Sequence, residues 1–283
     1  MLYYFNNEPA KLAAVLAEVG PVVQAGGGLP EKQFLTALLR CQLVQRRHRV
    51  DEEIIATARA ALAAAEEGGR QPLLIPLPEP QRGDHEIGWS QYNLGRCLVL
   101  HGGLDEAGET LSAALATADR MGEEVLRVRA LSLLALAALR RHDAVAVAGL
   151  VHRVLEAPAL TQWPEYLAMA KASLAWLVWR EGRIAEVSPL AEEALALWAK
   201  TTGWQPLHWI CLWPLIAVRL GIGNVSEAVD ASRQLLELSQ QRLPEELEPV
   251  VMEAGAAWES GNRELAGAKL ARAVELAHDL HYL

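Results

Sequence analysis

The chain has 283 residues, of which 52% are hydrophobic and 6% aromatic, and its formal net charge at pH 7 is −9. Alanine and leucine dominate the hydrophobic residues, whereas strands would require an excess of β-branched and aromatic residues, so the composition favours an all-α fold. The acidic balance and the absence of a basic cluster longer than Arg46-Arg47 argue against a nucleic-acid interface and favour a neutral or cationic partner.

The cysteines and the N-terminus indicate the compartment. Cys41, Cys97 and Cys211 are odd in number and far apart, so they form neither a disulfide framework nor a CxxC site. The first residues do not have the pattern of a secretory leader, and the apolar runs are shorter than the ~18 residues of a membrane span. We therefore expect a cytoplasmic protein without direct contact to a membrane.

The first part of the chain predicts one lone helix and one helical hairpin. Residues 1–28 read as a partial repeat, with a helix that carries apolar residues on more than one side. Residues 30–67 read as a first complete hairpin, with helices over 31–47 and 51–67. Residues 68–88 contain four prolines and predict an extended insertion, because proline removes a helical hydrogen bond. We expect this insertion to be a surface loop, with a functional lid as the alternative.

Residues 89–283 predict five hairpins of about 40 residues. The reference unit is 94–115, in which apolar and small residues form matching stripes on two helices joined at Gly102. Corresponding turns fall at intervals of 39, 41, 41 and 38 residues, at Gly102, Arg141, Gly182, Gly223 and Gly261. Small residues at the helix contacts allow the paired helices to approach closely.

The pattern Leu94-Gly95, Gly102 and Ala107 resembles the signature of the tetratricopeptide repeat. The resemblance implies a single domain, residues 1–283, folded as a right-handed α-solenoid of tetratricopeptide-like helical hairpins (an α-α superhelix). Such scaffolds bind partners on the surface that their first helices line.

Three further stretches, 173–195, 209–215 and 240–244, resemble the C-terminal helical region of bacterial signal-transduction ATPases. In that family, repeats of the maltose-regulon-activator type follow an ATPase, which is often preceded by a nucleotide-cyclase or transcriptional-activator domain. No GxxxxGK[ST] phosphate loop occurs in this chain. The ATPase, cyclase and DNA-binding functions of that family are therefore not expected of it. The resemblance implies the sensor or interaction module of such a bacterial regulatory protein.

The candidate binding residues form an aromatic stripe on the first helices, opposite the hairpin seam. In one interpretation, the large rings fill a half-buried inner surface. In the other, they line a groove in which two arginines bind a carboxylate or phosphate. The stripe comprises Trp89, Tyr92, Arg96, Trp176, Trp179, Arg180, Trp209, Trp213 and Trp258.

This stripe predicts a protein or peptide segment bound in the concave groove. The alternative is a sensor domain that binds a small anionic or aromatic molecule between the tryptophans and arginines. We find no catalytic set and expect no enzyme activity, no cofactor and no metal site. His278, His281 and Glu275 share a helical spacing, but two exposed histidines without a third fixed ligand do not make a metal site.

The two ends of the helical array should differ in the polarity of their outer faces. The C-terminal helix, 264–280, carries enough charged residues to serve as a cap, whereas the N-terminal helix is apolar over 12–23. An uncovered apolar helix leaves an adhesive edge. We therefore expect either self-association through the N-terminal helix or an upstream ATPase domain that covers it.

Overall fold

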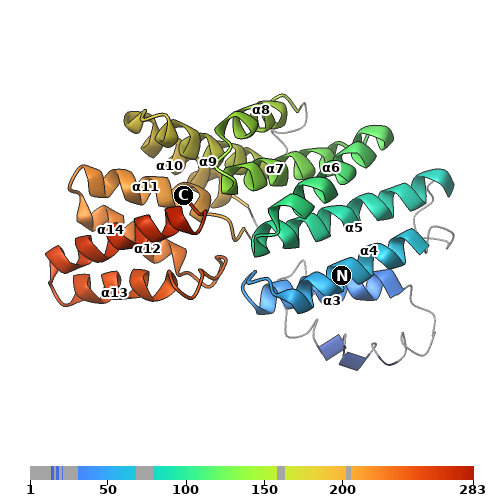
Figure 1. Cartoon of the computed structure of the whole chain (residues 1–283), viewed down its shortest axis with the longest axis horizontal. Helices are drawn as coiled ribbons and strands as arrows, with labels where there is room; N and C mark the ends of the chain where they lie inside the picture. Colours follow the sequence, from blue (N-terminus) through green and yellow to red (C-terminus); the bar gives the residue numbers. More distant parts are fainter. Residues whose placement is uncertain are drawn as a thin grey trace. The chain divides into compact units, whose positions relative to one another are not determined.

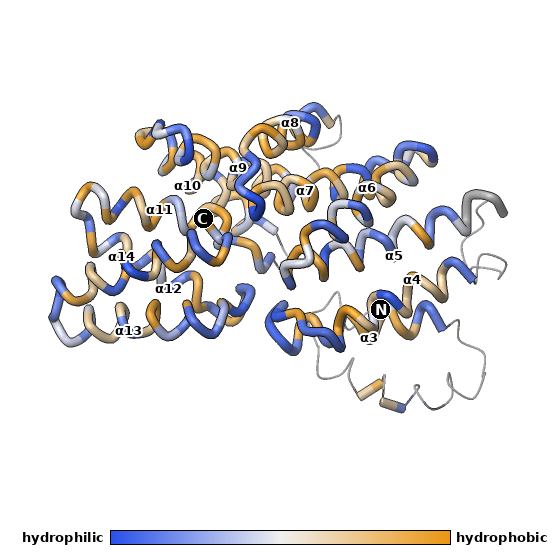
Figure 2. The backbone as a smooth tube through the Cα atoms, in the orientation of Figure 1, coloured by the Kyte–Doolittle hydropathy of each residue, from blue (hydrophilic) through white to orange (hydrophobic). Residues whose placement is uncertain are grey.

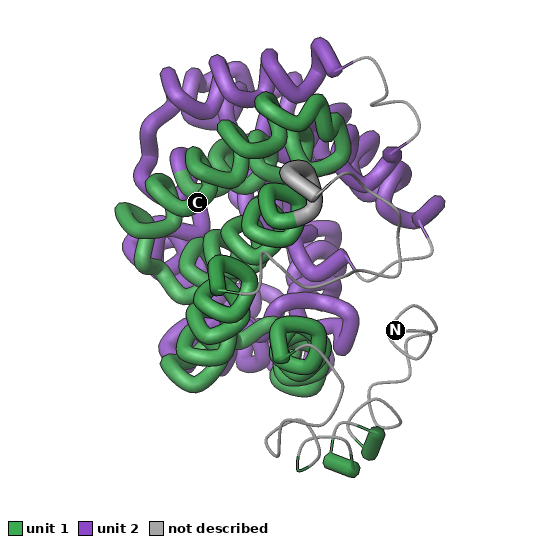
Figure 3. The backbone as a smooth tube through the Cα atoms, turned by 90° about the vertical axis from the view of Figure 1, so that its right-hand side faces the viewer, with its two compact units in different colours: residues 1–137 green, residues 138–283 purple. Residues whose placement is uncertain are grey.

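The structure is a computed structural model that describes residues 14, 15, 17, 18, 21, 31–67, 79–157, 163–201 and 205–283. Within these ranges it contains twelve named α-helices and one short 3₁₀ helix, and no strand (Figure 1). The prediction of an all-α fold is thereby confirmed for the described residues. The chain forms two compact units, residues 1–137 and 138–283, which Figure 3 shows in separate colours. Each unit is described by itself below.

Unit 1 is built from antiparallel neighbours along the chain. Helix α3 packs on α4, α4 on α5, and α5 on α6. Helix α7 begins in this unit, and the unit boundary falls near its end. The helices are α3 (Glu31–Gln45), α4 (Glu52–Glu67), α5 (Glu79–His101), α6 (Leu104–Met121) and α7 (Glu124–Arg140). The predicted lone helix over residues 9–28 lies outside the described residues, except for five helical positions.

Helix α5 begins ten residues earlier than the sequence pattern predicts. The expectation that residues 68–88 are extended was wrong for 79–88, which belong to α5. Pro80 is compatible with this helix because it lies in the first turn, where a backbone N–H has no intrahelical acceptor. The remaining predicted insertion residues, 68–78, lie outside the described part of the chain.

The contact between α5 and α6 depends on the absence of a side chain at Gly95. A Cβ atom added there would lie 2.5 Å from Cγ of Leu111 and 2.6 Å from its Cδ2. Leu111 is fully buried on α6, so it has little freedom to move away. The close approach predicted for the small residues of this hairpin is therefore present at Gly95.

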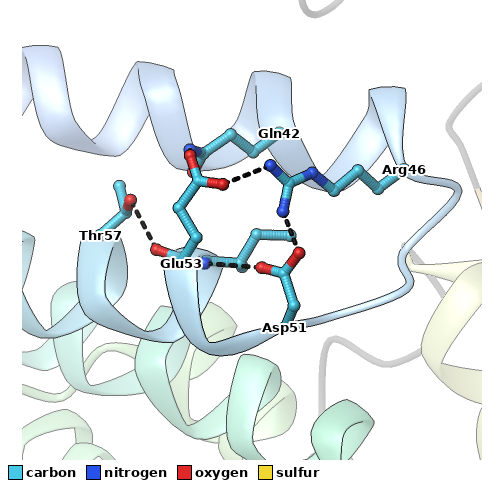
Figure 4. Close-up of polar contacts among 6 residues, drawn as sticks. Gln42, Arg46, Asp51, Glu53 and Thr57 are labelled. Carbon is cyan, nitrogen blue, oxygen red and sulfur yellow. Dashed lines mark hydrogen bonds and ion pairs between the residues drawn. The ribbon is translucent and has the colours of Figure 1, made fainter.

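The turn between α3 and α4 is held by polar contacts (Figure 4). Arg46 at the end of α3 forms an ion pair with Asp51 and a second one, of 2.6 Å, with Glu53. Asp51 also accepts a hydrogen bond of 3.1 Å from the backbone N–H of Ile54, as an N-cap residue does. Gln42 donates to Glu53 across the two helices. One arginine thus connects the end of α3 to the start of α4.

In unit 2, consecutive hairpins pack on one another. Helix α9 packs on α10 and also on α11, the first helix of the following hairpin. Helix α10 contacts α11, and α12 contacts both α13 and α14. The helices are α8 (Ala144–Leu155), α9 (Pro164–Arg180), η2 (Ile184–Glu186), α10 (Val187–Trp198), α11 (Trp209–Gly221), α12 (Val225–Leu235), α13 (Glu248–Glu259) and α14 (Arg263–Asp279).

The last hairpin departs from this order. Helix α14, expected from its charged residues to be an outer cap, packs on α11 and α12 as well as on α13. Ala266, Leu270, Ala273 and Ala277 form its buried face, and each is fully buried. Helix α14 therefore covers part of the unit 2 core, because its apolar stripe outweighs the charges on its other faces.

The predicted turn positions carry the backbone conformation that a tight helical turn requires. Gly102, Gly182, Gly223 and Gly261 all have positive φ angles, between 72° and 113°. At the turn predicted around Arg141, the residue with positive φ is His142, with a φ of 57°. Glycine adopts this conformation without steric cost, whereas histidine does not.

Three of the helices that follow these turns begin with a capping side chain. Asp143, Asn224 and Asn262 each accept a hydrogen bond from the backbone N–H three residues later. The distances are 3.0, 3.3 and 3.1 Å, respectively. These side chains satisfy N–H groups that the first helical turn leaves without partners.

Hydrophilic and hydrophobic segments alternate along the helices of both units (Figure 2). The alternation follows the helical period and places the apolar residues on the faces by which the helices pack. None of the helices in the described ranges has the combined length and apolar character that crossing a membrane requires.

His208 makes the stability of unit 2 depend on pH. Its ring stacks on Trp198 at 4.6 Å between centroids, and burial lowers its pKa to about 4. Since the ordinary pKa of histidine is about 6.5, the unfolded chain binds the proton more readily. The contribution of neutral His208 to the free energy of unfolding is therefore complete above pH 6.5. It is lost as the pH falls from 6.5 to about 4.

We expect the free energy of unfolding to fall by about 1–3 kcal/mol over this window because of His208. Urea denaturation of wild type and His208→Gln at pH 7.5 and 4.5 measures this contribution. The variant should lose less stability on acidification than wild type. Equal losses would show that His208 does not carry this pH dependence.

Candidate functional site

In unit 1, the predicted stripe residues Trp89 and Tyr92 contact other side chains of the unit. The guanidinium of Arg129 lies 4.9 Å from the ring centroid of Trp89 and 5.9 Å from that of Tyr92. The indole N–H of Trp89 donates a hydrogen bond of 2.8 Å to Glu123, which also bonds His85 at 2.9 Å. Burial opposes the charge of Glu123, but the hydrogen bonds from His85 and Trp89 prevail and lower its pKa. These rings belong to a cluster in which His85 and Trp89 both bond to Glu123.

Arg96 also has an intramolecular contact. Its guanidinium lies 3.1 Å from Nδ1 of His48, which is almost fully buried. Burial lowers the pKa of His48 well below its usual value, and the charge of Arg96 lowers it further. His48 is therefore neutral near pH 7, and its ring nitrogen can accept the hydrogen bond from Arg96.

In unit 2, three of the predicted tryptophans are buried. Trp176 and Trp213 are 0% exposed, and Trp209 is 3% exposed. In this arrangement they cannot provide contact area to a partner. Their burial favours the interpretation that these three rings fill the interior, while a binding role for the whole stripe stays a prediction.

The other three predicted residues of unit 2 are accessible. Trp179 is half-buried, Arg180 is exposed, and Trp258 is half-buried on α13. The guanidinium of Arg180 lies 5.5 Å from the ring centroid of Trp176, and that of Arg263 lies 5.4 Å from the centroid of Trp258. Arg180 is thus an exposed cation placed over a buried ring.

The ends of α9 and α11 lie together and form what we call the turn edge, residues 179–184 and 219–223. Val178, Val187 and Val218 make one buried cluster, against which Trp179 packs. Two large aliphatic side chains are exposed on this edge, Ile184 at 42% and Ile222 at 68%. The sequence reasoning missed both, although each lies within two residues of a predicted turn glycine, where exposure is expected.

The predicted site residues therefore separate into a buried set and an accessible set, and two of the accessible residues, Trp179 and Arg180, lie on the turn edge. No protein-family model matches the chain, and no curated protein matches it.

Three histidines of unit 2 lie close together. The ring of His142 lies 5.0 Å from that of His278 and 4.9 Å from that of His281, between centroids. Burial lowers the pKa of His142, and the nearby charges of the other two rings and of Arg180 lower it further. A hydrogen bond to the backbone of Leu283 acts in the opposite direction. Among the described residues, no group of three His, Cys, Asp or Glu side chains has an arrangement that could hold a metal ion.

The residues after α14 fold back onto unit 2 (Figure 1). The ring of Tyr282 lies 4.7 Å from that of Trp209, between centroids, and the guanidinium of Arg140 lies 5.0 Å from the Tyr282 centroid. Gln241 connects the two rings: its amide oxygen accepts a 2.9 Å hydrogen bond from the indole of Trp209, and its amide nitrogen donates a 3.5 Å bond to the Tyr282 hydroxyl. We call these four residues the Tyr282 site.

Proposed function

We propose that this chain is a non-enzymatic scaffold that binds a protein or peptide segment, built as a right-handed solenoid of tetratricopeptide-like hairpins. The resemblance to the C-terminal repeats of bacterial signal-transduction ATPases suggests the sensor or interaction module of a regulatory protein in the cytoplasm. Transcription regulation and an upstream ATPase domain belong to this proposal.

The observation that carries the proposal is the packing of successive hairpins in unit 2. Helix α9 packs on both its own partner, α10, and the next first helix, α11. A stack of this kind buries one face of each hairpin against its neighbour and leaves a row of turns and helix ends for contacts with a partner. Together with the turns at intervals of about 40 residues, four at glycines and one at His142, this supports a repeat scaffold.

The turn edge is the surface that we assign to the partner. Trp179 supplies part of an aromatic ring, Ile184 and Ile222 supply exposed aliphatic area, and Arg180 supplies a charged donor. Interfaces commonly combine a few aromatic and arginine anchors with surrounding apolar contacts. A segment with apolar side chains and one carboxylate or phosphate has the complementary chemistry.

A library of linear peptides displayed on phage provides the probe for this proposal. We expect selection on the purified chain to enrich peptides whose synthetic forms bind it in fluorescence anisotropy. Arg180→Ala should weaken this binding by tenfold or more, because a charge-assisted hydrogen bond contributes about 1.5–3 kcal/mol.

Arg263→Ala is the matched control, since it removes an arginine placed over a tryptophan at nearly the same distance, but on α14. This control variant should bind the selected peptides like wild type. Failure to enrich any binding peptide would contradict the proposed function. Equal weakening by both variants would contradict its assignment to the turn edge.

A further inference from the structure

The Tyr282 site has the composition of a specific receptor for a tyrosine side chain. Arg140 and Gln241 are polar, yet they are only 8% and 4% exposed, and both contact Tyr282. Burying an arginine and an amide is costly unless their polar groups find partners. Here a guanidinium faces the ring, an amide reaches the hydroxyl, and Trp209 supplies an aromatic surface. The site thus recognises the face, the edge and the hydroxyl of one tyrosine.

The occupant of this site is the turn that ends α14 together with the two residues after it. Helix α14 ends at Asp279, and Tyr282 and Leu283 follow it, 5% and 0% exposed. The backbone N–H groups of both residues bond to the carbonyl of Ala277, at 2.7 and 3.2 Å. The remaining contacts of Tyr282 described above are made by its side chain, which a segment of another protein could reproduce.

The first residue of this segment, His281, has an unfavourable backbone conformation. His281 has a positive φ of 61°, a conformation that costs a non-glycine residue about 1 kcal/mol or more. Its ring also lies 4.9 Å from that of His142, and its charge is one of the causes that lower the pKa of His142, after burial. A partner segment that presents the same tyrosine without this backbone strain has an advantage over residues 281–283.

We propose that the Tyr282 site is a docking site for a segment that presents a tyrosine followed by an aliphatic residue, and that residues 281–283 occupy it until such a partner arrives. The proposal rests on the proposed function, since it names the chemistry of one partner of the scaffold. It concerns a different surface from the turn edge, so the two can fail separately.

The first test uses the peptide DLHYL, which copies residues 279–283, and the control peptide DLHAL. In full-length Tyr282→Ala, the site loses the tyrosine ring that fills it, whereas in wild type the peptide must compete with that ring at an effective concentration of about millimolar. We expect DLHYL to bind the variant at least tenfold more tightly than wild type, measured by ligand-observed NMR. DLHAL should bind neither protein.

A second measurement needs no substitution and covers the case in which Tyr282→Ala fails to fold. Excess DLHYL should accelerate hydrogen exchange at the backbone amides of Tyr282 and Leu283 in wild type, because displacement breaks their bonds to Ala277. The amide of Gly261, bonded to Trp258 in the preceding turn, should not respond. DLHAL serves again as the control.

Three results would overturn the proposal. The first is that DLHYL binds a folded Tyr282→Ala variant no more tightly than wild type, or does not bind it. The second is that DLHYL leaves hydrogen exchange at the amides of Tyr282 and Leu283 unchanged. The third is dimerisation of wild type through this segment in light scattering, which would assign the site to a second copy of the chain. Each of these results leaves the peptide selection and the Arg180 comparison unaffected.

Discussion

Replacing Trp213 with alanine should lower the free energy of unfolding by about 3–5 kcal/mol. Trp213 is 0% exposed and lies on α11, which packs on α9, α10, α12 and α14. Removing its ring leaves a cavity among helices that cannot all close around it. Urea denaturation followed by far-ultraviolet circular dichroism measures the loss.

Trp258→Ala is the matched control, because Trp258 was predicted on the same stripe but is only half-buried. It should cost less than about 2 kcal/mol, in proportion to the apolar area that it buries. If Trp213→Ala instead left stability unchanged and abolished partner binding, Trp213 would belong to an open groove and the assignment to the interior would be wrong.

Gly95→Leu should destabilise the α5–α6 hairpin by about 1–3 kcal/mol, the usual cost of overpacking a close contact. Even the first added atom would lie 2.5 Å from Cγ of Leu111, whose side chain is fully buried. The two helices must separate to admit the new side chain. Denaturation curves of the variant and wild type give the difference.

Gly149→Leu provides the opposite case, because a Cβ at this α8 position meets no atom within 4 Å. Leucine is favoured over glycine inside a helix by up to about 1 kcal/mol, so this variant should be at least as stable as wild type. Destabilisation by both substitutions to the same extent would show that Gly95 has no special packing role.

The local features of the fold could be predicted from the sequence because they depend on neighbouring residues. Gly102, Gly182, Gly223 and Gly261 have positive φ, as glycine between two apolar helical stripes indicates. The turn at His142 was placed one residue early, because no glycine marks it. The start of α5 was predicted too late. The four prolines of residues 68–88 indicated an extended segment, but Pro80 lies in the first turn of α5, where a helix accepts proline.

The arrangement of the candidate site could be predicted only in part. Helical spacing predicts that Trp209 and Trp213 share a face of one helix, but not what covers that face. In the structure, α14 packs on α11, and Tyr282 contacts Trp209. These contacts join residues that are distant in sequence, and single-chain periodicity contains no information about them. The exposed Ile184 and Ile222 could have been found, because a turn glycine lies within two residues of each.

Hydrogen exchange of the chain with and without a selected peptide tests the central claim, that unit 2 is a recognition scaffold and that the turn edge receives the partner. The account predicts slower exchange in residues 179–187 and 219–225 on binding, because a docked segment shields these turns from water. Exchange in α3 and α4 should not change. Protection confined to α3 and α4, or no protection in either turn at saturating peptide, would contradict the claim.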